Sequence, residues 1–316
     1  MRSVGPNSFT EVYFPGCNPS FVETDEGILM IDTPQNAIDA VRWREMLRER
    51  SKGRIRYLVN TEPHGDHIFG NCFFKDVPVI GHRLLQECFV ESTDAVGPAG
   101  RGMEARIEHA RKTDPDSVWL LMHPDYQPYH GPTIIFEDEM KVELGKHTFH
   151  LLHTPGHTAP QVAVYVPKEG VVFTGDTVFC KCKTWLQDAD PWLWLKALQT
   201  INALDVETIV PGHGEPCSKA YLQHQQQIIE DWLGIVEEWV RRGLSEDEAV
   251  AEIAAVRPVD PYPPGQRFMR SVDEINVISI RNLYRRVVER NASGATSARR
   301  ISEPASEFQP HRGLVR

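Results

Sequence analysis

A short loop at residues 61–67 carries the densest group of chemically reactive side chains in the sequence. Two histidines and two carboxylates lie within residues 62–67 (EPHGDH), directly after the apolar run 55–60. Pro63 and Gly65 disfavour regular structure, so we expect a tight loop at the end of a buried strand. Imidazole and carboxylate groups bind zinc and other first-row divalent metals. Taken alone, the loop is either part of a metal site or a solvated turn.

Other predicted strands end in the same kinds of side chain. Each of these residues is accompanied by glycine or proline, which indicates a turn after the strand. Functional groups are commonly placed on loops that a rigid strand holds. Four further candidates share this placement: Asp32, His157, Asp176 and His213. Because several strand ends can gather at one edge of paired sheets, we expect these side chains to build one metal site together with the loop.

Two series of predicted strands position these residues. The first is a β-β-β-α-β arrangement with strands at 9–14, 19–24, 27–31 and 55–60 and a helix near 37–47. The second series begins at 133–136 and continues at 140–144, 147–152, 161–166, 170–174 and 208–210. Short alternating or continuous apolar runs of this kind are typical of strands. Two β-rich halves with helices outside predict an α/β protein.

We expect three regions along the chain. Residues 1–217 form the core, residues 218–290 form helices packed on that core, and residues 291–316 form a disordered tail. Within the core, residues 90–132 are rich in glycine, proline and charge and lack a clear period. A long irregular insertion is either a functional lid or a disordered excursion. Its aromatic side chains and histidines favour the lid.

Composition excludes several classes of protein. The formal net charge of −10 argues against nucleic-acid and membrane-surface partners, so we expect a small-molecule substrate. The six cysteines are scattered, which favours free thiols over a disulfide framework. We see no signal peptide and no run long enough to span a membrane, and therefore expect a cytoplasmic protein. The apolar C-terminal helices and the tail suggest a homodimer or a homotetramer.

Taken in chain order, the motifs resemble the metallo-β-lactamase superfamily over residues 9–215. The resemblance is carried by Asp32-Thr33, the loop at 62–67, Gly156-His157-Thr158, Gly175-Asp176 and the turn at 211–214. It implies a four-layer αββα sandwich, the metallo-β-lactamase fold, with a C-terminal helical extension. It also implies a site for two divalent metal ions at one edge of the sandwich, with zinc as the first expectation.

The same resemblance assigns the candidate side chains to two groups joined by one shared carboxylate. The first group is Glu62, His64 and His157, the second is Asp66, His67 and His213, and the shared carboxylate is Asp176. Asp32 is expected to lie behind the ligand loops and to brace them by hydrogen bonds. We expect His153 to be structural or to support the ligands from outside.

Glu62 departs from the family pattern, which has a histidine at this position. If Glu62 binds metal, the net charge of two divalent ions with their carboxylates is about +1, against about +2 with histidine. The ions would then be weaker Lewis acids, and manganese or iron would suit the first position better than in an all-histidine site. The alternative is that Glu62 binds nothing and that one ion is held by Asp66, His67 and His213.

Three functions are compatible with these residues. The first is a metallo-hydrolase in which a metal-bound hydroxide attacks the carbonyl of a lactam, lactone, ester or thioester. Asp66 would then orient the nucleophile or take its proton, and Tyr126 or Tyr129 of the insertion would donate a proton or stabilise the oxyanion. The second is a di-iron oxidoreductase of the same superfamily. The third is a non-catalytic binding protein with an altered metal site.

Overall fold

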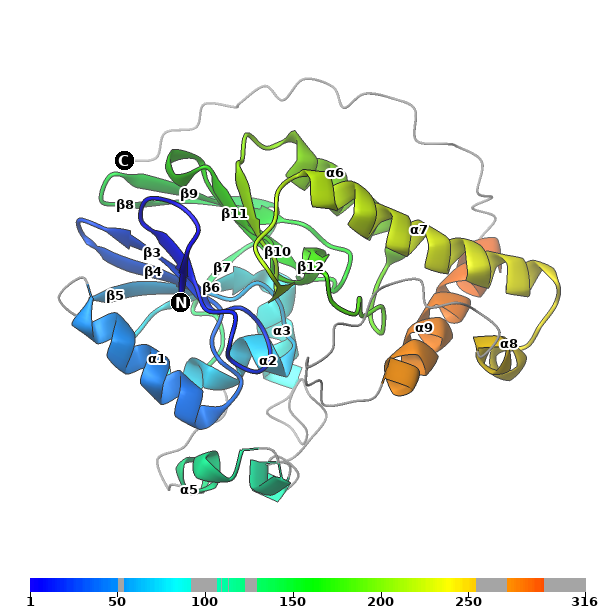
Figure 1. The fold of residues 1–316 in the computed structure, drawn as a ribbon, viewed down its shortest axis with the longest axis horizontal. Helices are drawn as coiled ribbons and strands as arrows, with labels where there is room; N and C mark the ends of the chain where they lie inside the picture. Colours follow the sequence, from blue (N-terminus) through cyan, green and yellow to red (C-terminus); the bar gives the residue numbers. More distant parts are fainter. Residues whose placement is uncertain are drawn as a thin grey trace.

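Two β-sheets packed face to face form the centre of the molecule, and helices lie on their outer sides (Figure 1). The computed structural model describes residues 1–50, 54–91, 107–108, 110–112, 114–122, 130–253 and 272–292. The order of layers is helix, sheet, sheet, helix. The expected four-layer αββα sandwich with a C-terminal helical extension is therefore confirmed.

The first sheet has seven strands in chain order, and its second half is parallel. Its strands are β1 (Arg2–Ser3), β2 (Ser8–Thr10), β3 (Ser20–Thr24), β4 (Gly27–Ile31), β5 (Ile55–Val59), β6 (Val79–His82) and β7 (Ile134–Phe136). Strands β4, β5, β6 and β7 pair in parallel. Because parallel strands end at the same edge, the segments that follow β4, β5 and β6 lie together there.

One strand lies in a different sheet from the one we predicted. We expected residues 133–136 to open the second strand series, but β7 pairs in parallel with β6, with Ile80 opposite Ile134. A three-residue apolar run carries no information about which sheet it joins, because pairing depends on distant strands. The second sheet therefore begins one strand later.

The second sheet has five strands, and a separate two-stranded ribbon lies beside it. The sheet has the order β13 (Thr208–Val210), β11 (Val171–Phe173), β10 (Val162–Val166), β9 (His147–His153) and β8 (Glu139–Leu144). The ribbon pairs β12 (Phe179–Cys180) in parallel with β14 (His213–Gly214). We did not predict the ribbon from the sequence. It places the segment after β13 next to the segment after β11.

Strand β4 shows why the core has layers. All five of its residues are buried, because the strand is covered on both faces. Leu29 and Ile31 pack into the apolar layer between the two sheets. Ile28 and Met30 point the other way and pack against Trp43 of α1 (Ala37–Glu49). The two-residue alternation of a strand thus feeds two separate apolar layers.

The helices of the second half pack on the outer side of the second sheet and on one another, with the last two at the far end of the longest helix (Figure 1). They are α6 (Pro191–Ala203), α7 (Ala220–Arg241), α8 (Glu246–Glu252) and α9 (Val272–Ala292). Trp194, Trp232 and Ile280 lie in the same buried cluster, so α6, α7 and α9 share one apolar layer. Ser245 and Glu248 form a capping box at the start of α8.

Several expected features fall largely outside the described residues. Of the insertion at 90–132, the structure gives the end of α3 (Arg83–Glu91), some helical residues near 110, and the short helices η4 (Pro115–Ser117) and α5 (Val118–Leu121). Residues 293–316 of the expected tail are not described. The division at residue 217 stays a prediction. Within the described ranges, no helix has the length and apolarity needed to cross a bilayer.

A buried carboxylate ties the N-terminal strands to the second sheet. Glu169 accepts hydrogen bonds from the backbone nitrogen and side-chain amide of Asn7, at 2.6 and 3.0 Å, and from Ser8. The ring of His147 lies 2.8 Å from the same carboxylate. Burial raises the pKa of Glu169, but the hydrogen bonds from Asn7 and His147 outweigh it and lower the pKa below the usual 4.5.

We expect Glu169→Gln to lower the free energy of unfolding by about 1–3 kcal/mol at neutral pH, because hydrogen bonds to a charged group are lost. Because the pKa of Glu169 is lower in the folded state than in the unfolded state, its ionised carboxylate stabilises the fold at pH values above the unfolded-state pKa. This contribution disappears as the pH falls through the folded-state pKa. The difference between wild type and variant should therefore shrink below a pH of about 4.5. Urea unfolding of both proteins at several pH values measures this difference in the free energy of unfolding. A difference that stays constant on acidification would contradict the assigned network.

Candidate metal centre

The loop after β5 is more regular than we predicted. Gly65–Ile68 form one helical turn, α2, which continues into η2 (Phe69–Phe74). Gly65 does not break the structure here but permits close packing. A Cβ atom at Gly65 would lie only 2.2 Å from the ring of Phe69. The turn presents Asp66 and His67 toward the edge where the strands end, while Glu62 and His64 precede it.

The first group of candidate ligands meets around the carboxylate of Glu62, which is fully buried. Its Oε2 atom lies 2.9 Å from His64 Nδ1 and 3.7 Å from His157 Nε2. Asp176 Oδ2 lies 3.4 Å from the same nitrogen of His157. One donor atom from each of these four residues lies within 4.8 Å of the others. Residues from three distant segments thus form one cluster.

The second group lies beside the first. Asp66 Oδ2 is 3.1 Å from His213 Nε2 and 3.9 Å from His67 Nε2. Asp176 faces both groups, because its Oδ1 lies 3.2 Å from His67 of the second group and its Oδ2 lies 3.4 Å from both His213 of the second group and His157 of the first. This is the placement that a carboxylate shared by two ions requires. All seven predicted ligand side chains are brought together.

Glu62 also faces both groups, which the sequence did not predict. Its second oxygen, Oε1, lies 3.0 Å from His67 Nε2. Glu62 therefore lies between His64 on one side and His67 on the other. Together with Asp176, it gives the centre two carboxylates that reach both groups.

The metal-donor atoms of the candidate ligands are better suited to binding a divalent cation than to hydrogen bonding with one another. Both oxygens of Glu62, Oδ1 of Asp176 and Nε2 of His67 are buried, and within the described part of the chain no hydrogen bond of good geometry satisfies them; their close neighbours are the other candidate ligands. Such unsatisfied buried atoms cost free energy unless another group pairs with them. Nε2 of His157 and Nδ1 of His64 lie 3.1 Å apart. The opposite nitrogen of each ring is engaged elsewhere, so both of these inner nitrogens point into the cluster.

The charges of the site also favour the binding of cations. Burial raises the pKa of Asp66, but the nearby His67 and His213 lower it to about 2. Burial likewise raises the pKa of Asp176, and His213 and His67 hold it well below its usual range. Burial lowers the pKa of His64, yet Glu62 and a second carboxylate raise it well above normal. The carboxylates are ionised, and the cluster attracts positive charge.

Asp32 braces the second group from behind. It accepts hydrogen bonds from the backbone nitrogen and hydroxyl of Thr61, at 2.8 and 2.6 Å. It also accepts from His67 Nδ1 at 2.8 Å, which directs His67 Nε2 toward the cluster. Asp32 has a φ of 54°, in the left-handed region. Cys17 lies beside this pair, and burial raises the pKa of its thiol to about 12.

No sequence pattern indicated the segment that braces the first group. Asp188, in the segment after β12, lies 3.0 Å from His64 Nε2. The backbone oxygen of Trp185 accepts a hydrogen bond from His157 Nδ1 at 3.0 Å. An exposed aspartate and a backbone carbonyl in a tryptophan-rich stretch carry no motif, so no sequence pattern would have identified them.

The remaining predicted site residues are His153, Tyr126 and Tyr129. The ring of His153 stacks on His82 with centroids 3.8 Å apart, and its Nε2 lies 2.8 Å from the backbone oxygen of Ala159. His153 therefore lies outside the clusters found among the described residues. Tyr126 and Tyr129 lie outside the described residues, so their catalytic roles stay predictions.

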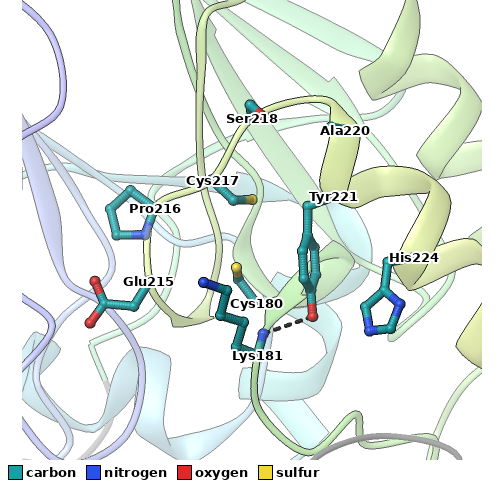
Figure 2. Close-up of a pocket in the computed structure, with 9 residues that line it drawn as sticks. All are labelled: Cys180, Lys181, Glu215, Pro216, Cys217, Ser218, Ala220, Tyr221 and His224. Atoms are coloured by element: carbon teal, nitrogen blue, oxygen red, sulfur yellow. Dashed lines mark hydrogen bonds between the residues drawn. The ribbon is translucent and has the colours of Figure 1, made fainter.

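A surface pocket of about 370 Å³ lies next to the ribbon β12–β14 (Figure 2). The ring of Phe179 stacks on His213 at 5.3 Å, while the next residue of the strand, Cys180, lines the pocket with Cys217 and Tyr221. Because successive strand residues point to opposite faces, the pocket lies behind the cluster. The nine residues drawn in Figure 2 include none of the candidate ligands.

The fold and the cluster define a protein with a candidate dinuclear metal centre at the edge of an αββα sandwich. The family model of the metallo-beta-lactamase superfamily matches residues 12–213. The chain belongs to this superfamily.

Individual relatives are distant. The linear primary-alkylsulfatase of a Pseudomonas species is 21% identical over 288 residues, which cover 83% of this chain and 54% of the relative. The hydroxyacylglutathione hydrolase of Erythrobacter litoralis is 28% identical over 55% of each chain. This chain thus spans about half the length of these curated relatives.

Solved structures share the fold at low identity. The sec-alkylsulfatase Pisa1 from Pseudomonas sp. matches with a TM-score of 0.64 at 16% identity, over 90% of this chain and 49% of that one. The DIM-1 metallo-beta-lactamase matches with a TM-score of 0.56 at 16% identity, over 73% of this chain and 96% of that one.

Proposed function

We propose that the chain is a metal-dependent hydrolase that cleaves an ester or thioester bond. The observation that carries the proposal is the set of buried, unsatisfied donor atoms on Glu62, His67 and Asp176, which face the other candidate ligands. Membership of the metallo-beta-lactamase superfamily supports it. Hydroxyacylglutathione hydrolases among the relatives support a thioester as the substrate.

The residues would divide the work as follows. The first group with Glu62 and the second group with Asp66 would each hold one divalent ion, and Asp176 would contact both. Bound there, the ions would supply Lewis acidity toward the substrate oxygen and lower the pKa of water. The side chain of Asp66 is 24% exposed, whereas those of Glu62 and Asp176 are 0% and 4% exposed. Asp66 is therefore the carboxylate that can meet an attacking water, orient it and accept its proton.

Asp66→Asn tests this role. The amide keeps one oxygen toward the cluster but accepts no proton, so we expect turnover to fall by about 10²–10⁴-fold, the usual contribution of general-base catalysis. The assay uses protein reconstituted with zinc or manganese and a glutathione thioester, with metal content measured alongside. Asp205→Asn changes an exposed aspartate and serves as the matched control. Wild-type turnover by Asp66→Asn with full metal content would refute the assigned mechanism.

Cleavage of a sulfate ester is the second candidate. The similarity to linear primary-alkylsulfatase covers 83% of the chain, more than the family model, and so extends into the C-terminal helices. Assaying a primary alkyl sulfate beside a glutathione thioester, with the same reconstituted protein, separates the two candidates. We expect a measurable rate with one substrate and none with the other.

A further inference from the structure

We infer that Asn282 of α9 is a positioning residue for the first metal group, acting through a segment at residues 185–190. The inference rests on the proposed function, because it concerns how that site holds its ligands. Helix α9 lies beyond the residues that the family model matches. The C-terminal helices would then be part of the working site rather than an added layer.

The 185–190 segment holds the outer nitrogen of two candidate ligands. The carbonyl oxygen of Trp185 receives the Nδ1 hydrogen of His157 at 3.0 Å, which leaves Nε2 facing Glu62. The carboxylate of Asp188 lies 3.0 Å from His64 Nε2, which leaves Nδ1 facing Glu62. Outer hydrogen bonds of this kind fix the tautomer and the orientation of a metal-binding imidazole. The position of the segment therefore decides where both rings point.

Asn282 fixes the backbone of this segment at two points. Its side-chain amide donates to the backbone oxygen of Leu186 at 2.7 Å and to that of Ala189 at 2.9 Å. The backbone nitrogen of Leu186 in turn donates to the hydroxyl of Ser279, one turn earlier on α9, at 3.2 Å. Leu186 and Ala189 are fully buried, so their backbone groups depend on protein partners. The two residues of α9 supply three hydrogen bonds to one short segment.

Helix α9 has other attachments that do not involve the segment. Ile280, Leu283 and Val287 pack into the apolar layer shared with α6 and α7. The hydroxyl of Tyr284 donates to the backbone oxygen of Leu244 at 2.8 Å. Arg281 and Arg285 pair with Glu246 of α8. Removing the Asn282 amide should therefore leave the helix docked, while the segment loses two of its three hydrogen bonds to α9.

The two metal groups should respond differently. The first group depends on the 185–190 segment through His64 and His157. The second group is braced by Asp32, which contacts His67 and directly follows strand β4 of the first sheet. Loss of the Asn282 amide should weaken binding at the first group and spare the second.

The test is calorimetric titration of zinc into the metal-free full-length protein. We expect Asn282→Ala and Asn282→Asp to weaken one of two binding events by about tenfold, the lower end of the effect of outer hydrogen-bond partners, and to leave the other within about twofold. Ser279→Ala, which removes one acceptor only, should have a smaller effect on the same event. Tyr284→Phe is the matched control, because it removes one hydrogen bond of α9 without touching the segment.

Each outcome decides the inference. Unchanged affinities in both Asn282 variants would overturn it. An equal loss in Tyr284→Phe would also overturn it, since the effect would then belong to helix docking. If Asn282→Ala fails to fold, Asn282→Asp and Ser279→Ala carry the same comparison, and unchanged binding in them refutes the inference. A wild-type protein that takes up no divalent metal would instead contradict the proposed function.

Discussion

Replacing Asp176 by alanine is expected to abolish the binding of both metal ions and all hydrolysis that depends on them. Asp176 is the carboxylate whose two oxygens face His67 on one side and His157 and His213 on the other. Losing one outer hydrogen-bond partner of a ligand typically weakens a metal site about 10–100-fold, and removing a shared ligand should exceed this at both positions. Atomic emission on protein purified by gel filtration gives the metal content directly.

A stability measurement separates this result from simple unfolding. Without metal, Asp176 is a buried charge beside two other carboxylates, Glu62 and Asp66. Its removal takes away the ion pairs with His67 and His213 that hold its pKa well below the usual range, so the metal-free variant should unfold cooperatively, at a temperature no higher than that of the metal-free wild type. Wild type alone should then gain stability when zinc is added. Retention of one tightly bound ion by Asp176→Ala would show that Asp176 serves a single ion.

Replacing Glu62 by alanine is expected to remove one ion of the two. The Oε2 atom of Glu62 faces His64 and His157 of the first group. The metal-donor atoms of the second group, on Asp66, His67 and His213, remain in the variant. We expect turnover to fall by about 100-fold or more, because the lost group contacts the ion directly. Native mass spectrometry after reconstitution counts the ions bound to each variant.

Glu62→His is the matched variant, because it introduces the histidine that the resemblance implies at this position. It should bind two ions, with higher zinc affinity at the first group, since an imidazole is a softer ligand than a carboxylate. Glu62→Gln keeps the size of the side chain and removes its charge, so it tests whether charge or shape matters. Two ions bound with wild-type affinity in Glu62→Ala would rule out Glu62 as a ligand.

The residues that the structure gathers at the candidate site could be selected from the sequence because they follow strands. Asp32, His157, Asp176 and His213 each come after an apolar run that forms a strand or its close continuation. A strand end is a local feature, so a residue that follows a strand can be identified from the sequence without knowledge of the fold. Their convergence followed from the resemblance to the superfamily, and the αββα sandwich with it.

The failures concern contacts between distant segments. Strand β7 joined the first sheet through pairing with β6, which no local pattern specifies. Asp188 reaches His64 across more than a hundred residues of chain, and Asn282 reaches the same region from the last described helix. The second role of Glu62, between His64 and His67, depends on side-chain direction rather than spacing. Such features follow from packing, which the order of residues expresses only indirectly.

The backbone at Asp32 narrows the residue types that this position tolerates. A φ of 54° is strained for most side chains by about 1–2 kcal/mol, and glycine, asparagine and aspartate accept it most readily. The contacts to Thr61 and His67 require, in addition, a group that only accepts hydrogen bonds. Glycine accepts the left-handed backbone but offers no hydrogen-bond acceptor. Asparagine accepts the backbone and offers one acceptor oxygen, but its other terminal group donates. Aspartate accepts the backbone and offers two acceptor oxygens. We therefore expect saturation mutagenesis of the chain to find almost no functional substitute at this position.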